Sequence, residues 1–600
     1  MTEFSMLPIA APTERHRSLF RRILRRPLAL VALVFLFAVA VVALIGRPIS
    51  PYDPQTSVIK DVLASPGAEH LLGADSAGRD VLSRLLTGTQ VSIAAAIVAL
   101  VVALLIGVIG GLIAGYYGGV FDSISSWLTS IVMALPAVIV LLAARAALGP
   151  SIWVSMAIFG VLLSPAFFRL VYASVSAVRS ELYVDAARVS GLSDLRIIGR
   201  HILSVVRAPI IIQSAVILGI AISVQSGLEF LGLGDLSVPS WGSMLNDGFV
   251  AVYREPLLML WPSLAIGLTS VALVIVSNAA RDELERSAPR RRRRRGATAK
   301  ETTVGEHVEA IVHADETEER VRQSDVLLDV RDLVVGYDRD SGSVLEVVKG
   351  VTFDVRRGEV HGIIGESGSG KTQTAFAILG LLPAGGRVVG GSITFEGQPI
   401  GDAPESVYRG IRGRRIAYIP QEPMSNLDPA FTIGSQLTEP MRVVLGLSRS
   451  AAKVRALELL ARVGIPNPAR TFAAYPHEIS GGMAQRVLIA GAVSCDPELL
   501  IADEPTTALD VTVQAEVLDL LRDLQAERNM GLLLVTHNFG VVADLCDRVS
   551  VMKAGRIVET GPVRSIFADP QHEYTRSLLD AILEDGAPRQ PLAAEQGAQA

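Results

Sequence analysis

Long apolar runs dominate the first 280 residues of the chain. Six stretches carry no charged side chain, at residues 28–46, 91–121, 123–144, 151–168, 209–228 and 256–280. Each is about as long as an α-helix needs to cross a hydrocarbon layer of roughly 30 Å. Because lipid offers the backbone no hydrogen-bond partner, long continuous runs of this kind favour helices. The pattern predicts an all-α, six-helix transmembrane domain; six buried core helices of a soluble domain fit it poorly.

Basic residues near these runs predict the orientation of the spans. The segment before the first span contains Arg15, Arg17, Arg21, Arg22, Arg25 and Arg26. The loop between the fourth and fifth spans contains Arg179, Arg188, Arg196, Arg200 and Arg207. Both segments are expected in the cytoplasm by the positive-inside rule. The first run is longer than a usual signal-peptide core, so an uncleaved anchor is favoured over a cleaved signal.

The pattern changes after the sixth span. Residues 290–295 are six consecutive arginines, and acidic residues follow. This composition is typical of a solvated tether, with contact to anionic membrane lipid as the alternative. From residue 326, short β-rich runs at 326–335, 359–364, 499–502 and 531–535 alternate with helical patterns such as 371–381. Such alternation predicts an α/β domain with a largely parallel sheet.

These patterns divide the chain into five parts. We expect a basic cytoplasmic N-terminus at 1–27, a transmembrane domain at 28–286, a charged linker at 287–325, an α/β domain at 326–583 and a tail at 584–600. The net charge of −5 gives no global positive field for nucleic acid. Two cysteines exclude a disulfide-rich scaffold and a cysteine-clustered metal site.

A phosphate-binding loop follows the strand predicted at 359–364. Its residues are Gly365, Glu366, Ser367, Gly368, Ser369, Gly370, Lys371 and Thr372. Glycines allow backbone N–H groups to turn toward phosphate oxygens, and the helix that begins at Lys371 adds positive potential. Lys371 is expected to reach the β- and γ-phosphates of a nucleotide, and the Thr372 hydroxyl to ligate Mg²⁺.

An apolar strand at 499–502 ends in two adjacent carboxylates. Asp503 suits the Mg²⁺ shell, and Glu504 is placed to orient or deprotonate an attacking water. A strand-end acidic pair that only caps the following turn is the alternative for this feature taken alone.

The segment between these two elements resembles the signature motif of ABC-transporter ATPases. It reads Ile-Ser-Gly-Gly-Met-Ala-Gln-Arg at residues 479–486. Other positions resemble the glutamine loop, the aspartate loop, the switch histidine and the adenine-stacking aromatic of that family: Gln421, Asp510, His537 and Tyr337. The resemblance implies a helical subdomain within the α/β domain, and two ATPase domains facing head to tail. Ser480, Gly481 and Gly482 of one would then cover ATP on the other.

The same resemblance assigns chemical roles. Glu504, His537 and Gln421 are implied to be catalytic, and Thr372, Gln421 and Asp503 to hold Mg²⁺. Tyr337, Asp510 and the phosphate loop are implied to bind ATP.

The cytoplasmic loop between spans four and five resembles the coupling loop of ABC importer permeases. The resemblance rests on Glu181, Asp185, Ala186, Ala187 and Gly191. Segments at 71–84 and 230–245 resemble permeases of dipeptide and oligopeptide importers, and 572–579 resembles the C-terminal helix of their ATPases. An ordinary amphipathic loop helix is the alternative for residues 181–191 taken alone.

The chain is therefore interpreted as a permease fused to an ATPase in a peptide importer of the cytoplasmic membrane. The alternatives are import of nickel chelates or another small solute and, less favoured, an ABC exporter or a non-transport ABC ATPase. The resemblance implies ATP and Mg²⁺, a second permease subunit, a second ATPase subunit or a homodimer partner, and an extracytoplasmic substrate-binding protein.

Overall fold

The computed structural model describes residues 24–149, 151–233, 238–287, 326–338, 344–383, 385–506 and 511–580. The predicted linker beyond Ser287, with its six arginines, lies outside these ranges, as do most of the basic N-terminus, the whole tail and Asp510. The described chain forms two compact units. One contains the residues before Ser180 and those from Ile202 to Ser287; the other contains Ser180–His201 and the residues after the linker.

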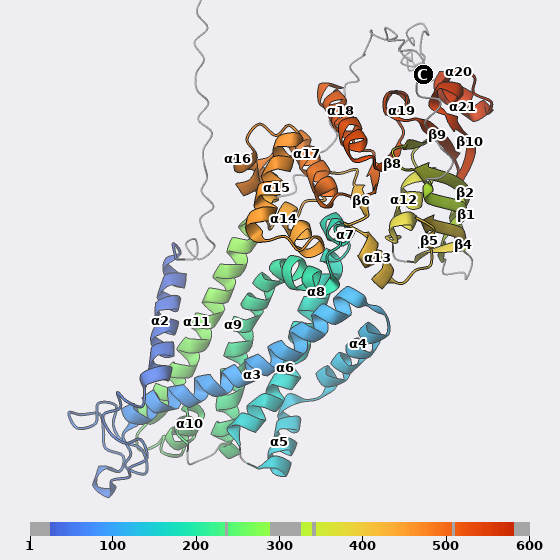
Figure 1. The fold of residues 1–600 in the computed structure, drawn as a ribbon. Helices are drawn as coiled ribbons and strands as arrows, with labels where there is room; N and C mark the ends of the chain where they lie inside the picture. Colours follow the sequence, from blue (N-terminus) through green and yellow to red (C-terminus); the bar gives the residue numbers. More distant parts are fainter. Residues whose placement is uncertain are drawn as a thin grey trace, which may run out of the picture. The chain divides into compact units, whose positions relative to one another are not determined.

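The first unit is helical (Figure 1). Its longer helices are α2 (Pro27–Ile45), α3 (Val81–Tyr117), α4 (Gly119–Ala134), α5 (Ala137–Leu148), α6 (Ile152–Val178), α9 (Leu203–Leu228), α10 (Trp241–Val250) and α11 (Leu257–Ser287). Five helices in the described chain are long and apolar enough to cross a membrane, and α4 with α5 supplies a sixth span if this bent pair is counted as one. The predicted helical transmembrane domain is thus confirmed.

The third apolar run is not the single straight helix that its length predicts. It breaks between α4 and α5, whose axes differ by 85°. The break falls at Leu135, which has an extended backbone with φ −79° and ψ 125° and precedes Pro136. A proline clashes with an α-helical residue before it, so the helix ends at that point. The second helix begins earlier than the uncharged run at 91–121 predicts: α3 starts at Val81, directly after its N-cap Asp80.

A stripe of small residues on α3 allows α6 to approach closely. Every fourth residue is alanine or glycine and is buried: Ala95, Ala99, Ala103, Gly107, Gly111 and Gly115. A Cβ added at Gly107 would lie 2.4 Å from the carbonyl oxygen of Ser164, and one at Gly160 would lie 2.5 Å from that of Ala99. Helices in lipid associate through such close packing, because no hydrophobic effect drives them together.

Gly107→Leu is expected to lower the amount of folded protein in membranes at least about fivefold, because the new side chain meets the backbone of α6. The measurement is the detergent-extracted, monodisperse yield. Gly267→Leu on α11 is the matched control, since a Cβ there meets no atom within 4 Å. Equal yields from the two variants would contradict the packing role of the stripe.

The second unit contains two sheets. The larger has the strand order β10-β9-β3-β8-β7-β6, and its strands run parallel except β10, which is antiparallel to β9. Its strands are β3 (Val360–Ile364), β6 (Ile416–Ile419), β7 (Leu499–Asp503), β8 (Gly531–Thr536), β9 (Arg548–Lys553) and β10 (Arg556–Pro562). The predicted α/β class and its buried strands are confirmed.

A smaller antiparallel sheet accompanies it, which the alternation of strands and helices did not predict. Its order is β2-β1-β4-β5, formed by β1 (Val326–Asp338), β2 (Val344–Arg356), β4 (Gly386–Phe395) and β5 (Gln398–Pro399). Its core packs around Phe353, Phe395 and the helix α12 (Lys371–Leu379).

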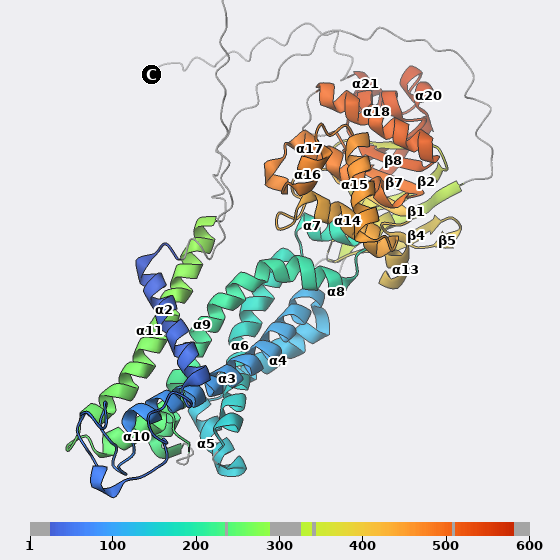
Figure 2. The same cartoon turned by 60° about the vertical axis from the view of Figure 1, so that its left-hand side comes forward.

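Helices gather on one side of this unit to form a helical subdomain (Figures 1 and 2). They are α14 (Ile433–Val444), α15 (Arg449–Arg462), α16 (Pro468–Ala473) and α17 (Gly481–Ala492). Their apolar faces share one core with β6, β7 and β8. The remaining helices are α13 (Glu405–Ile411), α18 (Val511–Arg528), α19 (Phe539–Leu545), α20 (Val563–Ala568) and α21 (Glu573–Asp580).

Candidate nucleotide and coupling sites

Four chemically distinct segments follow neighbouring parallel strands at one edge of the larger sheet. The phosphate loop follows β3, His537 follows β8, Glu504 follows β7 and Gln421 follows β6. In the sheet these strands lie in the order β3-β8-β7-β6. Carboxyl ends of parallel strands are where α/β sheets bind ligands. The fold therefore brings these residues to one edge.

The phosphate loop has the backbone shape that its glycines permit. Gly368 and Gly370 have φ values of 83° and 104°, a region that glycine enters at little cost. The Lys371 ammonium donates to the carbonyl oxygens of Gly365 at 2.7 Å and Glu366 at 2.9 Å. Burial lowers the pKa of Lys371, and the carboxylates of Glu504 and Asp503 oppose that shift. The lysine thus lies inside the loop at the start of α12.

Glu504 lies between two of the predicted catalytic side chains. Its Oε2 accepts a hydrogen bond from Gln421 Nε2 at 2.6 Å, and its Oε1 lies 2.8 Å from His537 Nδ1. The backbone of Glu504 has φ 46°, a left-handed value unusual outside glycine, and its N–H donates to Val535 at 2.8 Å. The carboxylate is therefore held from both sides, while the His537 side chain remains 54% exposed.

Asp503 has the properties of a cation ligand. It is 1% exposed, and burial raises its pKa to about 6. Thr372 and Tyr418 hydrogen-bond to it, and its Oδ1 has no hydrogen-bond partner among the described residues. A buried carboxylate oxygen beside a threonine hydroxyl matches the oxygen ligands that Mg²⁺ prefers. Gln421, the third residue predicted for the metal, instead bonds Glu504.

The signature segment lies on the helical subdomain. Ser480 is the N-cap of α17, and its hydroxyl accepts from the Met483 N–H at 3.3 Å. Ser480 and Gly481 are exposed, and a Cβ at Gly481 would meet no atom within 4 Å. No hydrogen bond among the described residues joins this segment to the phosphate loop of the same chain.

Tyr337 lies at the end of β1 beside the first turn of α12. Its hydroxyl donates to Gln373 Oε1, and its ring lies close to Gly386. The side chain is thus near the phosphate-loop helix, with part of its surface accessible to solvent.

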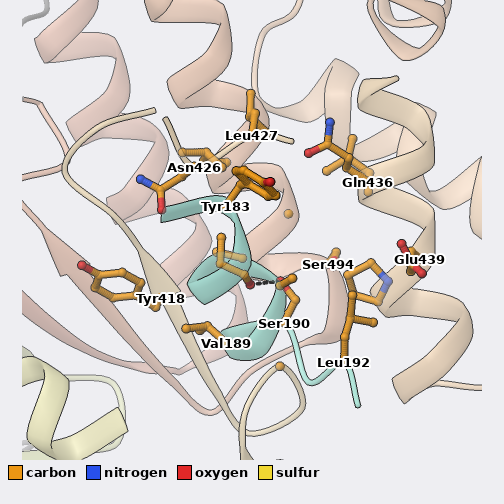
Figure 3. A pocket seen from close by; sticks show the side chains of 18 of the residues that line it. Tyr183, Val189, Ser190, Leu192, Tyr418, Asn426, Leu427, Gln436, Glu439 and Ser494 are labelled. Atoms are coloured by element: carbon orange, nitrogen blue, oxygen red, sulfur yellow. Dashed lines mark hydrogen bonds between the residues drawn. The ribbon is translucent and has the colours of Figure 1, made fainter. Parts of the chain in front are cut away.

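The predicted coupling residues form a short helix in a groove of the ATPase-like unit. Helix α7 (Leu182–Val189) is followed by α8 (Asp194–Arg196) and η2 (Ile197–Ile202). Figure 3 shows Tyr183, Val189, Ser190 and Leu192 among side chains from β6, α14 and the loop between them. The small side chains Ala186 and Ala187 also line this pocket. Residues Ser180–His201 thus pack as part of this compact unit.

Gly191 allows this segment to meet the backbone before β6. Its φ is 78°, and an added Cβ would lie 2.7 Å from the carbonyl oxygen of Arg412. The Arg412 guanidinium is buried and donates to the carbonyl oxygens of Leu379 at 2.7 Å and Gly380 at 2.8 Å. Those carbonyls end α12, the helix that begins in the phosphate loop. Arg412 therefore connects the coupling segment to the nucleotide site.

Sequence reasoning named Glu181 and Asp185 at the start of this segment but missed the residues that receive it. Glu181 is exposed at the N-cap of α7, and Asp185 pairs with Arg188 at 3.2 Å. The receiving residues include Arg412, Asp428 and Glu439, each less than 5% exposed. In the sequence, these three residues are marked only by their charge, which does not by itself predict burial in a groove.

Three protein families match separate parts of the chain. Residues 17–66 match the N-terminal TM domain of oligopeptide transport permease C. Residues 107–288 match the binding-protein-dependent transport system inner membrane component, and residues 348–507 match the ABC transporter family.

Curated relatives match the ATP-binding part. The dipeptide transport ATP-binding protein DppD of Escherichia coli (strain K12) is 45% identical over 271 residues, which cover 45% of this chain and 83% of that protein. The oligopeptide transport ATP-binding protein OppD of Salmonella typhimurium is 47% identical over 259 residues, covering 43% of this chain and 77% of that protein. The probable peptide ABC transporter ATP-binding protein y4tR of Sinorhizobium fredii is 48% identical over 261 residues, with 43% and 78% covered.

Three features define an ATP-hydrolysing ABC ATPase: the phosphate loop, the Glu504 carboxylate held by Gln421 and His537, and the helical subdomain. The preceding helices define a multi-pass permease of the binding-protein-dependent type. The chain belongs to the peptide-transport family of ABC importers and carries its permease and its ATPase on one polypeptide.

Proposed function

We propose that this chain couples ATP hydrolysis to the uptake of di- and oligopeptides across the cytoplasmic membrane. The observation that carries this proposal is the joint presence of an oligopeptide-type permease segment and an ATPase 45–48% identical to peptide-transport ATPases. Residues 28–286 form the permease and residues 326–583 the ATPase. The N-terminus, helix α7 and the ATPase face the cytoplasm, as the positive-inside pattern predicts.

Glu504 acts on the attacking water during hydrolysis. Gln421 donates to one of its carboxylate oxygens and His537 contacts the other, so the carboxylate is fixed before the nucleotide reacts. Lys371 supplies a cation for the phosphates, and glycine N–H groups of the loop at 365–370 bind their oxygens. Tyr337 stacks on the adenine at the end of β1.

Mg²⁺ fits beside the phosphate loop. Thr372 and the unpartnered Oδ1 of Asp503 would hold it, and Gln421, whose amide donates to Glu504, would be the third ligand. When bound, this ion would neutralise charge that develops on the phosphate oxygens. Its removal by a chelator is expected to stop hydrolysis.

The complete transporter has two ATPase domains and two permease domains. Ser480 and Gly481 are exposed and Gly482 is partly exposed at the start of α17, so this segment is available to cover ATP on a second ATPase domain. By its resemblance to the family's aspartate loop, Asp510 is also assigned to ATP binding. The second domains come from a partner subunit or a second copy, and a substrate-binding protein outside the membrane delivers the solute.

The test of the substrate uses the assembled complex in nanodiscs, with candidate binding proteins loaded with dipeptide, oligopeptide or a nickel chelate. We expect peptide-loaded protein to stimulate ATP hydrolysis at least about fivefold over the unloaded protein. Stimulation by the nickel chelate alone would replace peptide with the alternative solute. An absence of stimulation by every loaded protein would contradict import.

A further inference from the structure

Three cationic side chains at the end of the coupling segment face two buried carboxylates of the ATPase. His201 Nδ1 lies 2.7 Å from Asp428 Oδ2, and His201 Nε2 lies 3.4 Å from Glu439 Oε2. Arg200 Nη1 lies 3.1 Å from Glu439 Oε1, and Arg196 Nη1 lies 3.7 Å from the same oxygen. One end of the coupling segment is thus matched to an acidic part of the groove.

Both carboxylates are buried, and groups of the ATPase itself hold Asp428 in place. Asp428 Oδ1 accepts from the Ala430 N–H at 2.8 Å, and the Asp428 N–H donates to Gln436 Oε1 at 2.9 Å. Glu439 lies on α14, where Figure 3 shows it beside the same pocket as Leu192. Asp428 is 3% exposed and Glu439 is 4% exposed. Neither can turn freely toward water while the segment is in place.

Further contacts fix the arginine in one position. Arg200 Nη2 donates to Ser435 Oγ at 2.6 Å, and its guanidinium lies 4.9 Å from the centre of the Phe431 ring. The His201 ring packs edge-on to the same phenylalanine at 5.3 Å. Arg200 therefore meets a hydroxyl, an aromatic face and a carboxylate at once, which is a specific recognition geometry.

An ion pair just before Arg196 has the charges exchanged, with the acid on the segment and the cation on the ATPase. Asp194 of the segment accepts from Arg409 of α13 at 3.1 Å. From Asp194 onward the segment thus presents an acid and then three cations, and the ATPase presents an arginine and then two carboxylates. A segment docked in another register would place like charges together, which destabilises a complex.

We propose that this charge pattern selects which permease segment the ATPase domain accepts. The inference rests on the proposed function, with residues 181–191 as the coupling loop that their resemblance implies, and goes beyond it. A segment that lacks the basic end would cover Asp428 and Glu439 without a counter-charge, and a buried unpaired charge is strongly unfavourable. The acidic groove therefore favours the segment of its own chain and rejects a partner permease whose segment is not basic at this end.

The test uses the full chain, assembled with its partner domains, in proteoliposomes. Glu439→Lys is expected to lower solute uptake and solute-stimulated ATP hydrolysis at least about tenfold, because it places a cation among three cations. ATP binding should stay unchanged. Glu458→Lys, the same substitution at an exposed position on α15, is the matched control and should transport normally.

The reciprocal change separates recognition from general damage. Adding Arg200→Glu to Glu439→Lys restores opposite charges and should recover uptake at least about threefold over Glu439→Lys alone. The double variant Arg196→Glu with Arg200→Glu changes only partly exposed side chains. It represents a segment without a basic end, so we expect it to lose uptake as well. This variant provides the readout if Glu439→Lys does not fold.

Two results would overturn the proposal: uptake by the double-arginine variant within twofold of wild type, or no recovery in a folded reciprocal pair. Failure of the underlying coupling role is recognised separately, because Gly191→Val would then also transport normally.

Discussion

A chain with Glu504→Gln is expected to bind ATP normally and to hydrolyse it at least about 100-fold more slowly. The amide keeps the shape of the side chain but cannot accept a proton from water. Gln421 and His537 hold the carboxylate on either side, so its position is set by the protein rather than by solvent. Binding depends instead on the phosphate loop after β3, which the substitution leaves unchanged.

The measurement is phosphate release at saturating ATP together with nucleotide affinity by equilibrium binding. Glu527→Gln on the exposed surface of α18 is the matched control, and its hydrolysis should stay within twofold of wild type because surface ion pairs contribute little. Hydrolysis by Glu504→Gln at the wild-type rate would remove Glu504 from the chemistry. Loss of ATP binding would show that the residue supports the site structurally.

Gly191→Val is expected to abolish coupled uptake, with a loss of at least about tenfold, while ATP binding and membrane yield stay near wild type. The substitution fails locally for two reasons. A β-branched residue is strained at φ 78°, and its Cβ would lie 2.7 Å from the Arg412 carbonyl oxygen. The segment would be displaced from the groove beside β6 and α14.

Gly199→Val is the control for this variant. Gly199 belongs to the same segment, is exposed, and offers open space to an added Cβ. Uptake and ATP hydrolysis are measured together in proteoliposomes for both chains. Normal uptake by Gly191→Val would contradict the coupling role of the turn, and equal loss in the two variants would make the effect nonspecific.

Local patterns predicted most of the nucleotide edge. The strand ends before Gly365, Asp503 and Thr536 were visible as apolar runs, and parallel strands place their carboxyl ends at one edge. The pattern could not reveal that Gln421 and His537 bond opposite oxygens of one carboxylate, since this depends on side-chain directions. It also gave no sign of the positive φ at Glu504.

Long-range contacts account for what the sequence did not predict. His201 contacts Asp428, which lies 227 positions later in the chain, and the periodicity of a sequence does not predict such a contact. In the antiparallel sheet, the pairing of β1 with β2 and with β4 shifts register at several positions, which the alternation of side chains does not predict. The break at Leu135, by contrast, has a local cause in Pro136, which the hydropathy of the run does not reveal.

The proposed coupling has a physical basis in the packing of one short segment. The segment Ser180–His201 lies in sequence between two membrane helices, yet it packs with the ATPase fold as one unit. Arg412 contacts that segment through its backbone and the end of α12 through its side chain. A displacement of α12 on nucleotide binding would therefore reach the segment through packed groups.

Simultaneous measurement of uptake and ATP consumption tests the central claim most directly. The assembled complex is reconstituted with a loaded binding protein, and both fluxes are recorded in the same vesicles. We predict that solute accumulates only while ATP is hydrolysed, and that both fluxes fall together in Glu504→Gln. Solute accumulation without ATP hydrolysis would contradict the account, and so would an ATP hydrolysis rate that does not change with the solute and its binding protein.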